Sequence, residues 1–540
     1  MLQMEGAAKP RLPVLMALFK SQARRRKIPA PSDLAPSPPG CYKRSASNWG
    51  VAMKWKARSF VLVLGMAASA AQAEPATQQG AKQMLAGYVA IFGPTIADKG
   101  IVTVDPQGDS YKVTWHIRRA LDLIPAPPDQ FQMGDFTYQI TPGAGGAWRV
   151  TADAFPQIVF DAPTDKGRMS GKVDVTGMHI DIAYDPTQPA PFVSHSVFGD
   201  IVADVRVLDD GKVIPFRIEE SDLQADMKQT TTDVGANLAL HETARAYVQK
   251  MSIPVDTQPN AKIDASFTIG PATVDGTIDQ FRMQQALAAW RFVLAQKDQP
   301  KNETSLATLK TLLAAGLPGW TKMNLTTDLS DLAFEMPLAK AHMKGFRETI
   351  DLPGFTEVAT AGFGLKIDEF NMQSPFLPEG FESLLPLSLD FNVGAKIKGL
   401  DRIARIALED HDFLVEKDVS PEGQAKIEQI FLSSAPTFTL ARGYLRNPLI
   451  DLAYQGEAQV SPDDSVKGHV IVSVDTLDKV MAFVKPFAVL SPEIAQATLG
   501  IGAVKGMATA GPDGRLVWDI EMSGPPAQLT VNGVPFPIDK

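Results

Sequence analysis

Apolar and polar residues alternate with a period of two along much of this chain. In residues 111–117, for example, apolar side chains occupy every second position from Tyr111 to Ile117. Such alternation is typical of β-strands that bury one face and expose the other, and such strands pair antiparallel. The pattern recurs at residues 136–140, 148–152, 178–184, 201–207, 214–218, 263–269, 389–397, 470–474 and 516–522. It predicts an α+β, β-rich fold built on a mostly antiparallel sheet.

Turn signals between the alternating segments predict hairpins. Asp209-Asp210-Gly211-Lys212 joins residues 201–207 to 214–218, and its glycine suits a position with positive φ. A glycine-rich turn at 143–146 joins 136–140 to 148–152. Asn532-Gly533 is the predicted tip of a last hairpin over 529–536. The segments on either side of each turn are therefore predicted to be neighbouring strands.

Apolar residues at helical spacing predict short amphipathic helices over 81–92 and 306–313. A strand followed by a helix also recurs three times, with the predicted helices at 283–294, 403–407 and 480–484. An aspartate lies near the start of each of these three helices: Asp279, Asp401 and Asp475. We predict that these carboxylates are N-caps that accept backbone N–H bonds, rather than catalytic acids.

Gly316, Pro318 and Gly319 mark a predicted boundary between two β-rich halves, residues 74–318 and 319–540. The strand-then-helix repeat suggests that the two halves are similar. Without its first 73 residues, the 540-residue chain has 467 residues, which is too many for one small core. Two domains and one long continuous sheet are both compatible with that length.

Residues 53–73 have the three parts of a secretory signal peptide. Met53–Arg58 carries three cations, an uncharged apolar stretch follows, and Ala71-Gln72-Ala73 is an Ala-x-Ala cleavage site before Glu74. The apolar stretch is about a dozen residues, fewer than the roughly 20 that a membrane-spanning helix needs. The segment predicts cleavage between Ala73 and Glu74, export to the periplasm, and no transmembrane helix after cleavage.

Residues 1–52 are basic and rich in Pro, Ser and Arg, and they show no sustained period. This composition is typical of disorder. Because a signal peptide ordinarily begins a chain, we interpret residues 1–52 as a leader upstream of the true start at Met53.

Removal of residues 1–73 makes the protein strongly acidic. That segment contains twelve Lys and Arg against two acids, so a formal charge of −9 for the whole chain becomes −19 for residues 74–540. Such a charge repels nucleic acid and anionic lipid headgroups unless a basic patch intervenes. The single cysteine, Cys41, is removed as well. The mature chain is therefore expected to lack disulfides, zinc–thiolate sites and cysteine nucleophiles.

The sequence assigns no catalytic, cofactor-binding or metal-binding residue, and no cofactor is expected. His241-Glu242 begins like a zinc-protease motif, but Arg245 stands where the second histidine is required. His411 lies between Asp410 and Asp412, as a general base with an orienting carboxylate would. The same run is typical of a charged helix end, which is the interpretation we favour.

The other candidate motifs are interpreted as turn or surface features. Gly500, Gly502 and Gly506 do not open a helix after a strand, so a bulge or a close backbone approach is expected there. Three acidic pairs lack the spacing of a calcium loop and are assigned to turn chemistry: Asp209-Asp210, Glu219-Glu220 and Asp463-Asp464. Three histidines on the polar side of predicted strands are expected to face solvent: His116, His179 and His469.

Residues 430–440, Ile-Phe-Leu-Ser-Ser-Ala-Pro-Thr-Phe-Thr-Leu, and residues 529–533, Leu-Thr-Val-Asn-Gly, resemble the YdgA-like bacterial envelope proteins of unknown function. The chain is also similar to the broader AsmA-like set, in which strand-rich domains follow one export or anchor segment. The resemblance covers about the second half of the mature chain. It implies a long, curved antiparallel sheet facing the periplasm and a role in envelope maintenance or lipid handling. A cleavable signal in place of an uncleaved anchor departs from that pattern.

Two functional hypotheses follow. The first is an exported, non-enzymatic periplasmic protein that binds lipid or an envelope partner through the apolar face of a curved sheet. The second is an exported hydrolase acting on polysaccharide or peptide, with a pair of carboxylates that one sequence does not identify. The absence of a recognisable catalytic set favours the first hypothesis. The sequence gives neither the ligand nor the oligomeric state.

Overall fold

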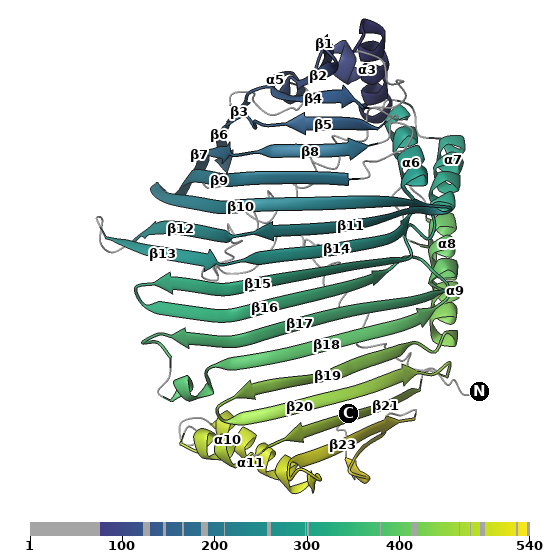
Figure 1. Cartoon of the computed structure of the whole chain (residues 1–540). Helices are drawn as coiled ribbons and strands as arrows, with labels where there is room; N and C mark the ends of the chain where they lie inside the picture. The colour runs from purple at the N-terminus through teal and green to yellow at the C-terminus, as the bar shows by residue number, and fades with distance from the viewer. Residues whose placement is uncertain are drawn as a thin grey trace, which may run out of the picture. The chain divides into compact units, whose positions relative to one another are not determined.

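A single antiparallel sheet of 25 strands dominates the part of the chain that the structure describes (Figure 1). The computed structural model describes residues 76–536, except for 123–129, 144–146, 165–166, 185–192, 210, 256–260, 297–298, 300–301, 378–379, 412–418, 464, 476, 487–491 and 525–527. All the described residues belong to one unit, Phe60–Lys540. The predicted β-rich α+β class with a long antiparallel sheet is confirmed.

The strands fall into three groups along the chain. The first group is β1 (Val102–Gln107), β2 (Ser110–Trp115), β3 (Phe131–Met133), β4 (Phe136–Pro142), β5 (Trp148–Ala152), β6 (Ile158–Thr164), β7 (Gly167–Thr176), β8 (His179–Tyr184) and β9 (Val193–Asp209). The second is β10 (Lys212–Thr232), β11 (Gly235–Ala244), β12 (Ala246–Pro254), β13 (Lys262–Ile269), β14 (Ala272–Phe281), β15 (Lys322–Met336), β16 (Ala339–Pro353), β17 (Val358–Gln373) and β18 (Leu387–Lys398). The third is β19 (Thr437–Asn447), β20 (Ile450–Val460), β21 (Val466–Val474), β22 (Thr509–Ala510), β23 (Leu516–Ser523), β24 (Gln528–Val531) and β25 (Val534–Phe536).

Strand order across the sheet largely follows the order along the chain. The main series runs β1, β2, β4, β5, β8, β9, β10, and later from β15 to β21, β23, β24 and β25. The 21-residue strand β10 pairs with β9 on one side and with both β11 and β12 on the other. Because β14 pairs with β15, on either side of the predicted boundary at 318, the two predicted halves share one sheet.

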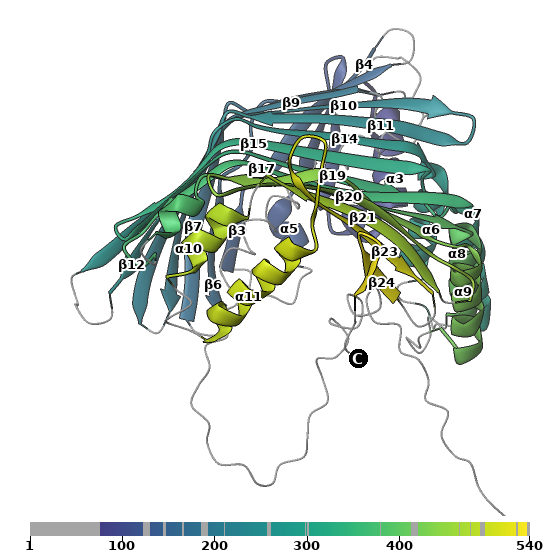
Figure 2. The same cartoon turned by 90° about the horizontal axis from the view of Figure 1, so that it is seen from below.

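Several long strands bend where a non-glycine residue has positive φ. These residues include Asp222 on β10, Asp331 on β15 and Glu369 on β17, with φ of 50°, 50° and 51°. Such conformations are uncommon outside glycine and persist only where the surrounding structure fixes them. On β17 the bend shifts the register, so that Ile367 and Phe370, three residues apart, both pair with leucines of β18. We call this line of bends the crease, and it accompanies the bending of the sheet seen in Figure 2.

Nine α-helices and one 3-10 helix occur in the described residues. They are α3 (Gln78–Phe92), α4 (Thr95–Asp98), α5 (Ile117–Leu121), α6 (Met283–Ala295), α7 (Glu303–Ala315), the 3-10 helix η3 (Phe381–Leu384), α8 (Leu400–Asp410), α9 (Pro421–Ser433), α10 (Asp478–Val484) and α11 (Pro492–Gly506). Helices α6 to α9 contact one another in order and line one edge of the sheet (Figure 1). Helices α10 and α11 lie on the inner side of the bend (Figure 2).

The first predicted helix forms because both of its ends are well capped. The Thr77 hydroxyl accepts a hydrogen bond from the Gly80 amide, and Gly93, with φ of 89°, ends α3. The buried face of this helix includes Met84 and Tyr88. It packs on β1, β2, β4, β5 and β8 in the larger of two hydrophobic cores. The smaller core lies near the C-terminus, where α11 residue Ile501 packs against Val474 and Trp518.

A tyrosine pair joins α3 to the sheet inside the larger core. The hydroxyl oxygens of Tyr88 and Tyr138 lie 2.6 Å apart, and Trp115 Nε1 donates to Tyr138 Oη at 3.3 Å. Tyr138 is 2 % exposed. Burial raises the pKa of Tyr138 from its usual 10.0 to about 12, against the smaller opposing effects of hydrogen bonds with Trp115 and Tyr88.

This shift predicts that the larger core weakens in alkali. A raised folded-state pKa contributes stability that is present below pH 10 and is lost as pH rises toward 12, because the unfolded tyrosine ionises first. The expected loss is roughly 2–3 kcal/mol, because burial raises the pKa of Tyr138 from 10.0 to about 12. Urea unfolding of the parent and of Tyr138→Phe should therefore show a smaller loss between pH 10 and 12 in the variant. Equal losses in both proteins would contradict the assignment to Tyr138.

The three N-cap predictions are wrong. They concerned Asp279, Asp401 and Asp475, whereas the N-cap positions of α6, α8 and α10 are held by Arg282, Gly399 and Leu477. Asp279 remains within β14, and the Asp475 carboxylate accepts a hydrogen bond from the amide of Asp451. Asp401 does lie in the first turn of α8, where a carboxylate is favoured by the helix dipole.

Three further local expectations are also wrong. Glu219-Glu220, assigned to turn chemistry, lies in the interior of β10. Gly500, Gly502 and Gly506 lie within α11, and a Cβ atom at each would meet no atom within 4 Å, so neither a bulge nor a close approach explains them. The strand predicted to reach Ile117 ends at Trp115, because α5 begins at Ile117.

Candidate functional site: the inner face of the sheet

Strand register places apolar residues in two continuous rows on one face of the sheet. Row one consists of direct cross-strand partners from β14 to β23: Ala272, Leu329, Phe346, Ile367, Leu389, Leu445, Leu452, Val474 and Leu516. Row two lies four residues from row one on each of the strands β14 to β18. It runs from β11 to β19: Leu240, Gly276, Leu325, Ile350, Phe363, Val393 and Leu440. We call the face that carries these rows the inner face.

The two cores cover only the ends of the inner face. Row one reaches the C-terminal core at Val474 and Leu516, which pack with α11, and α3 covers the other end. Between the cores, the described residues of both rows on β14 to β18 are half-buried or exposed and belong to neither core. Leu240, Phe363 and Val393 remain 37, 38 and 36 % exposed. Large exposed apolar surfaces of this kind mark interaction sites.

A row between the two apolar rows carries the polar groups of the middle inner face. Its members are direct partners on β14 to β18: Val274, Thr327, Glu348, Leu365 and Phe391. Thr327 and Glu348 are therefore neighbours, surrounded by apolar residues of the same face. They give the middle of the inner face one polar spot within a hydrocarbon-like surface.

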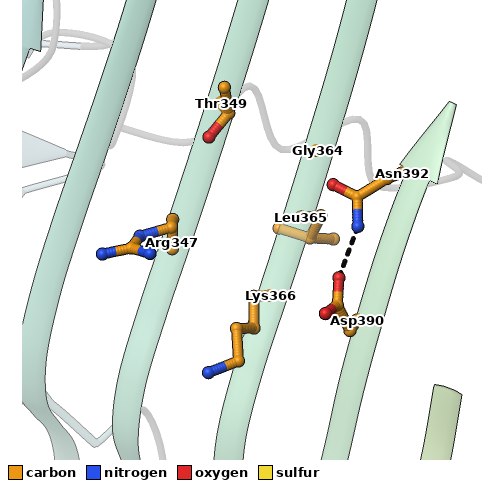
Figure 3. A pocket seen from close by; sticks show the side chains of 7 residues that line it. All are labelled: Arg347, Thr349, Gly364, Leu365, Lys366, Asp390 and Asn392. Carbon is orange, nitrogen blue, oxygen red and sulfur yellow. Dashed lines mark hydrogen bonds between the residues drawn. The ribbon is translucent and has the colours of Figure 1, made fainter. Parts of the chain in front are cut away.

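The opposite face, which we call the outer face, is polar along the same strands. Its residues alternate with those of the inner face, as expected for a period of two. One outer row consists of Asp328, Arg347, Lys366, Asp390 and Tyr444. Two shallow hollows lie along it. The smaller, of about 190 Å³, is lined by Arg347, Lys366, Asp390 and Asn392 among others, and Asn392 donates to Asp390 (Figure 3).

The larger outer hollow, of about 540 Å³, contains four cations that are already paired. The pairs are Arg347 with Asp328 at 2.5 Å, Lys366 with Asp368 at 2.9 Å, Lys344 with Glu369 at 2.8 Å, and Arg446 with Asp451 at 3.2 Å. Each cation is thus neutralised by a neighbouring carboxylate. Exposed pairs of this kind are worth little stability individually, and they leave no excess positive charge for an anionic ligand.

A ladder of alternating aspartates and histidines crosses another part of the outer face. Its members are direct partners on β8, β9, β10, β11 and β14: Asp181, His195, Asp226, His241 and Asp275. Nδ1 of His195 lies 2.7 Å from Asp226, and Nδ1 of His241 lies 2.7 Å from Asp275. A hydrogen bond from Arg149 holds the pKa of Asp181 below its usual range. The ladder is an exposed polar surface.

Three histidines outside the ladder are paired with aspartates as well. His116, His179 and His469 lie 2.6–2.7 Å from Asp135, Asp153 and Asp519. The side chains of His179 and His469 are 48 and 46 % exposed, which confirms that these two face solvent. His116 is more enclosed than predicted, with 22 % of its side chain exposed, because it lies beside α5.

The partial zinc-protease motif lies on a strand. Successive residues of β11 point to opposite faces, so His241 is on the outer face while Glu242 is on the inner face and only 6 % exposed. Arg245 forms an ion pair with Asp222 at the crease. Among the described residues, no group of three or more His, Cys, Asp or Glu side chains is placed to hold a metal ion.

His411 is at the C-terminal end of α8, as the helix-end interpretation expects. The Asp410 carboxylate accepts hydrogen bonds from both the hydroxyl and the amide of Ser420, the N-cap of α9. These hydrogen bonds hold the pKa of Asp410 below its usual range. Asp410 therefore joins two helices and is already engaged.

The carboxyl groups with a displaced pKa include five with a hydrogen-bonding partner as the leading cause. They are Asp161, Asp174, Asp181, Asp410 and Asp463, whose partners are Arg168, Gln157, Arg149, Ser420 and Ser465 respectively. All five shifts are downward, because the partners stabilise the charged carboxylate. A glycosidase general acid needs the opposite, a raised pKa.

Several predicted positions lie outside the described residues. They are residues 1–52, the signal segment 53–73 with Ala71, Ala73 and Glu74, and Cys41, Asp210, Asp412 and Asp464. None of the helices in the described part of the chain is both long enough and apolar enough to cross a membrane.

The sequence interpretation missed the strands that carry the middle of the inner face. The sequence interpretation assigns no element to residues 322–373, which form β15 to β17, although Met323, Leu325 and Leu329 follow a period of two. That alternation was the available signal. Thr327 interrupts it, which weakened the pattern in a single sequence.

Comparisons with known proteins found no matching family model, no matching curated protein and no matching solved structure.

Proposed function

We propose that this protein binds the hydrocarbon chains of a lipid along the uncovered inner face, as a non-enzymatic protein acting in the periplasm after export. One observation carries the proposal: rows one and two are continuous across the middle strands, and their members on β14 to β18 belong to neither hydrophobic core. Apolar surface left in contact with water favours an apolar ligand, because covering it removes that surface from water.

The dimensions of the inner face suit an acyl chain. Neighbouring strands are about 4.8 Å apart, so row one spans roughly 29 Å from β14 to β20. One leaflet of a bilayer contributes roughly 15 Å of hydrocarbon, half of a core about 30 Å thick. The inner face thus accommodates the length of one or two acyl chains, and Thr327 and Glu348 offer a polar group within reach of it.

A lipid fits this surface better than a structured protein partner does. Protein interfaces place hydrogen-bonding and charged groups around an apolar centre, which fixes the orientation of the partner. Rows one and two extend across many strands with few such groups. The signal segment 53–73 in the sequence supports the periplasmic part of the proposal.

The test is native mass spectrometry of protein purified from its own host without detergent. We expect bound species with the masses of membrane lipids, released by organic extraction. Protein that emerges free of lipid, and that does not take up a fluorescent fatty acid added at micromolar concentration, would refute the proposal.

A further inference from the structure

Glu348 is the only charged residue among the members of the three inner rows on strands β14 to β18. Its direct partners on the neighbouring strands are Thr327 and Leu365. Apolar residues of the same face complete its surroundings, two along β16 and four diagonally opposite on β15 and β17: Phe346, Ile350, Leu325, Leu329, Phe363 and Ile367. Diagonal neighbours are within reach of a long side chain. Glu348 is half-buried among these residues.

The Glu348 carboxylate has no partner in the part of the chain that the structure describes. It forms neither a hydrogen bond nor an ion pair with a described residue. Other carboxylates on β15 to β18 are engaged by a lysine, arginine or asparagine: Asp328, Glu335, Asp351, Asp368, Glu369 and Asp390. Withdrawing a carboxylate from water is unfavourable unless a cation or a hydrogen-bond donor accompanies it. Glu348 is therefore available to a cation that a ligand brings.

The protein places no cation beside Glu348. Among the described residues of the three rows on β14 to β18, none is a lysine or an arginine. The nearest cations in sequence and register, Arg347 and Lys366, lie on the outer face, because successive side chains of a strand point to opposite faces. An ammonium group of a ligand thus meets no competing side chain at Glu348, whereas a phosphate or a carboxylate meets no positive charge there.

The surroundings of Glu348 differ on its two sides. Toward β20, row one continues without a polar residue through Ile367, Leu389, Leu445 and Leu452. Four strand spacings of about 4.8 Å give roughly 19 Å, more than the roughly 15 Å of hydrocarbon in one bilayer leaflet. On the other side, the row of Glu348 contains Thr327 on β15 and Glu242 on β11. An amphiphile held by its polar end at Glu348 therefore has an apolar path for its chain along β17 to β20.

We infer that Glu348 binds the ammonium group of a cationic amphiphile, an inference that rests on the proposed function and adds the chemical class of its ligand. Apolar binding surfaces take their specificity from a few polar groups. An ammonium group satisfies the Glu348 carboxylate through a charge-assisted hydrogen bond, while the hydrocarbon chain covers row one. A lysine of a protein partner carries the same charge, but its four-carbon stem is too short to cover that row. A fatty-acid anion binds through its chain, with its own carboxylate directed away from Glu348.

The test is displacement of a fluorescent fatty-acid probe from the full chain by dodecylamine and by dodecanol. We expect the parent to bind the amine about tenfold more tightly than the alcohol, as one charged hydrogen bond contributes when the carboxylate is partly exposed. Glu348→Gln should bind both compounds equally and keep the dodecanol affinity of the parent. Glu457→Gln is the matched control and should keep the preference for the amine. Glu457 is exposed on the outer face of β20, next to Gly456, which pairs with Leu440 of row two.

A second variant tests the same carboxylate without removing it. Thr327→Lys places an ammonium group of the protein directly opposite Glu348, so it should also abolish the preference for dodecylamine. The inference is overturned if the parent shows no preference, if Glu348→Gln retains it, or if Glu457→Gln loses it to the same extent.

The three compounds separate this inference from the proposed function. If the parent binds dodecanol and fatty acid without preferring dodecylamine, the inference fails and the proposed function survives. If none of the three binds, the proposed function fails. Lysophosphatidylethanolamine then identifies the source of the ammonium group. A gain in its affinity that depends on Glu348 supports a lipid headgroup, and a gain confined to dodecylamine supports a free alkylamine.

Discussion

Replacing Phe136 by alanine should lower the free energy of unfolding by about 3–5 kcal/mol. Phe136 is 1 % exposed, and its ring lies 5.8 Å from Tyr138 and 5.7 Å from Phe155 between ring centroids. Removal of the ring leaves a cavity beneath α3 that its neighbours cannot fill without moving. Urea unfolding followed by circular dichroism measures the effect.

Phe363→Ala is the matched control, because it removes the same side chain from the uncovered part of the inner face. Phe363 is 38 % exposed, so less transfer free energy is lost and no closed cavity forms. We expect a cost below about 2 kcal/mol for this variant. If the two alanine variants were equally destabilised, the middle of the inner face would be as tightly covered as the core, contrary to the structure.

The second large effect concerns binding. Leu325→Asn combined with Phe363→Asn should weaken fatty-acid binding about 30–150-fold, because each change removes roughly 1–1.5 kcal/mol of apolar contact from row two. Both residues belong to that row, on strands β15 and β17 with Ile350 between them. Fluorescence titration with a fatty-acid probe measures the dissociation constant.

The matched control places the same new side chains on the outer face. Thr326→Asn with Thr349→Asn changes direct partners on β15 and β16, one residue from row two on each strand. We expect these outer variants to bind fatty acid like the parent. If the inner and outer variants weakened binding equally, the fall in fluorescence would reflect loss of folded protein and not loss of a binding site. If the inner variant bound fatty acid like the parent, the inner face would not be the binding site.

Much of the fold could be predicted from the sequence because its strands expose one face. The period of two predicts β4, β5, β8, β13, β18 and β23 near their observed bounds, but it covers only parts of the longer strands β9, β10 and β21. Gly211, with φ of 78°, closes the β9–β10 hairpin as its turn signal predicts. The arrangement of β10 against both β11 and β12 was not accessible. It depends on pairing between distant residues, which local periodicity does not encode.

Helix starts were less predictable for a physical reason. An aspartate near the start of a helix satisfies the composition of an N-cap, but only the residue at the boundary has the geometry to cap. Asp279 is held in β14 by its pairing with Lys322, so α6 begins later, at Met283. Strand pairing therefore decided where that helix begins, and its composition did not.

The candidate site was foreseen only in outline. The alternation of apolar and polar residues predicts that the curved sheet has one apolar face. To identify the residues of rows one and two, however, the register of each strand with the next must be known. The bends at Asp331 and Glu369 change which residues share a face, since two residues of opposite parity become inner-facing on either side of each bend. No local sequence signal marks these positions as bends, because most non-glycine residues, including most aspartates and glutamates, have negative φ.

The strands at the two ends of the main series, β1 and β25, are built in a way that hinders aggregation. A sheet with unpaired outer strands is a template onto which strands of other molecules add, and natural proteins block such growth with short strands and prolines. The last strand, β25, has three residues with Pro535 in the middle, and β1 at the other end contains Pro106. A proline has no amide hydrogen to donate. Each open end of this sheet thus lacks part of the hydrogen-bonding ladder on which fibril-like stacking depends.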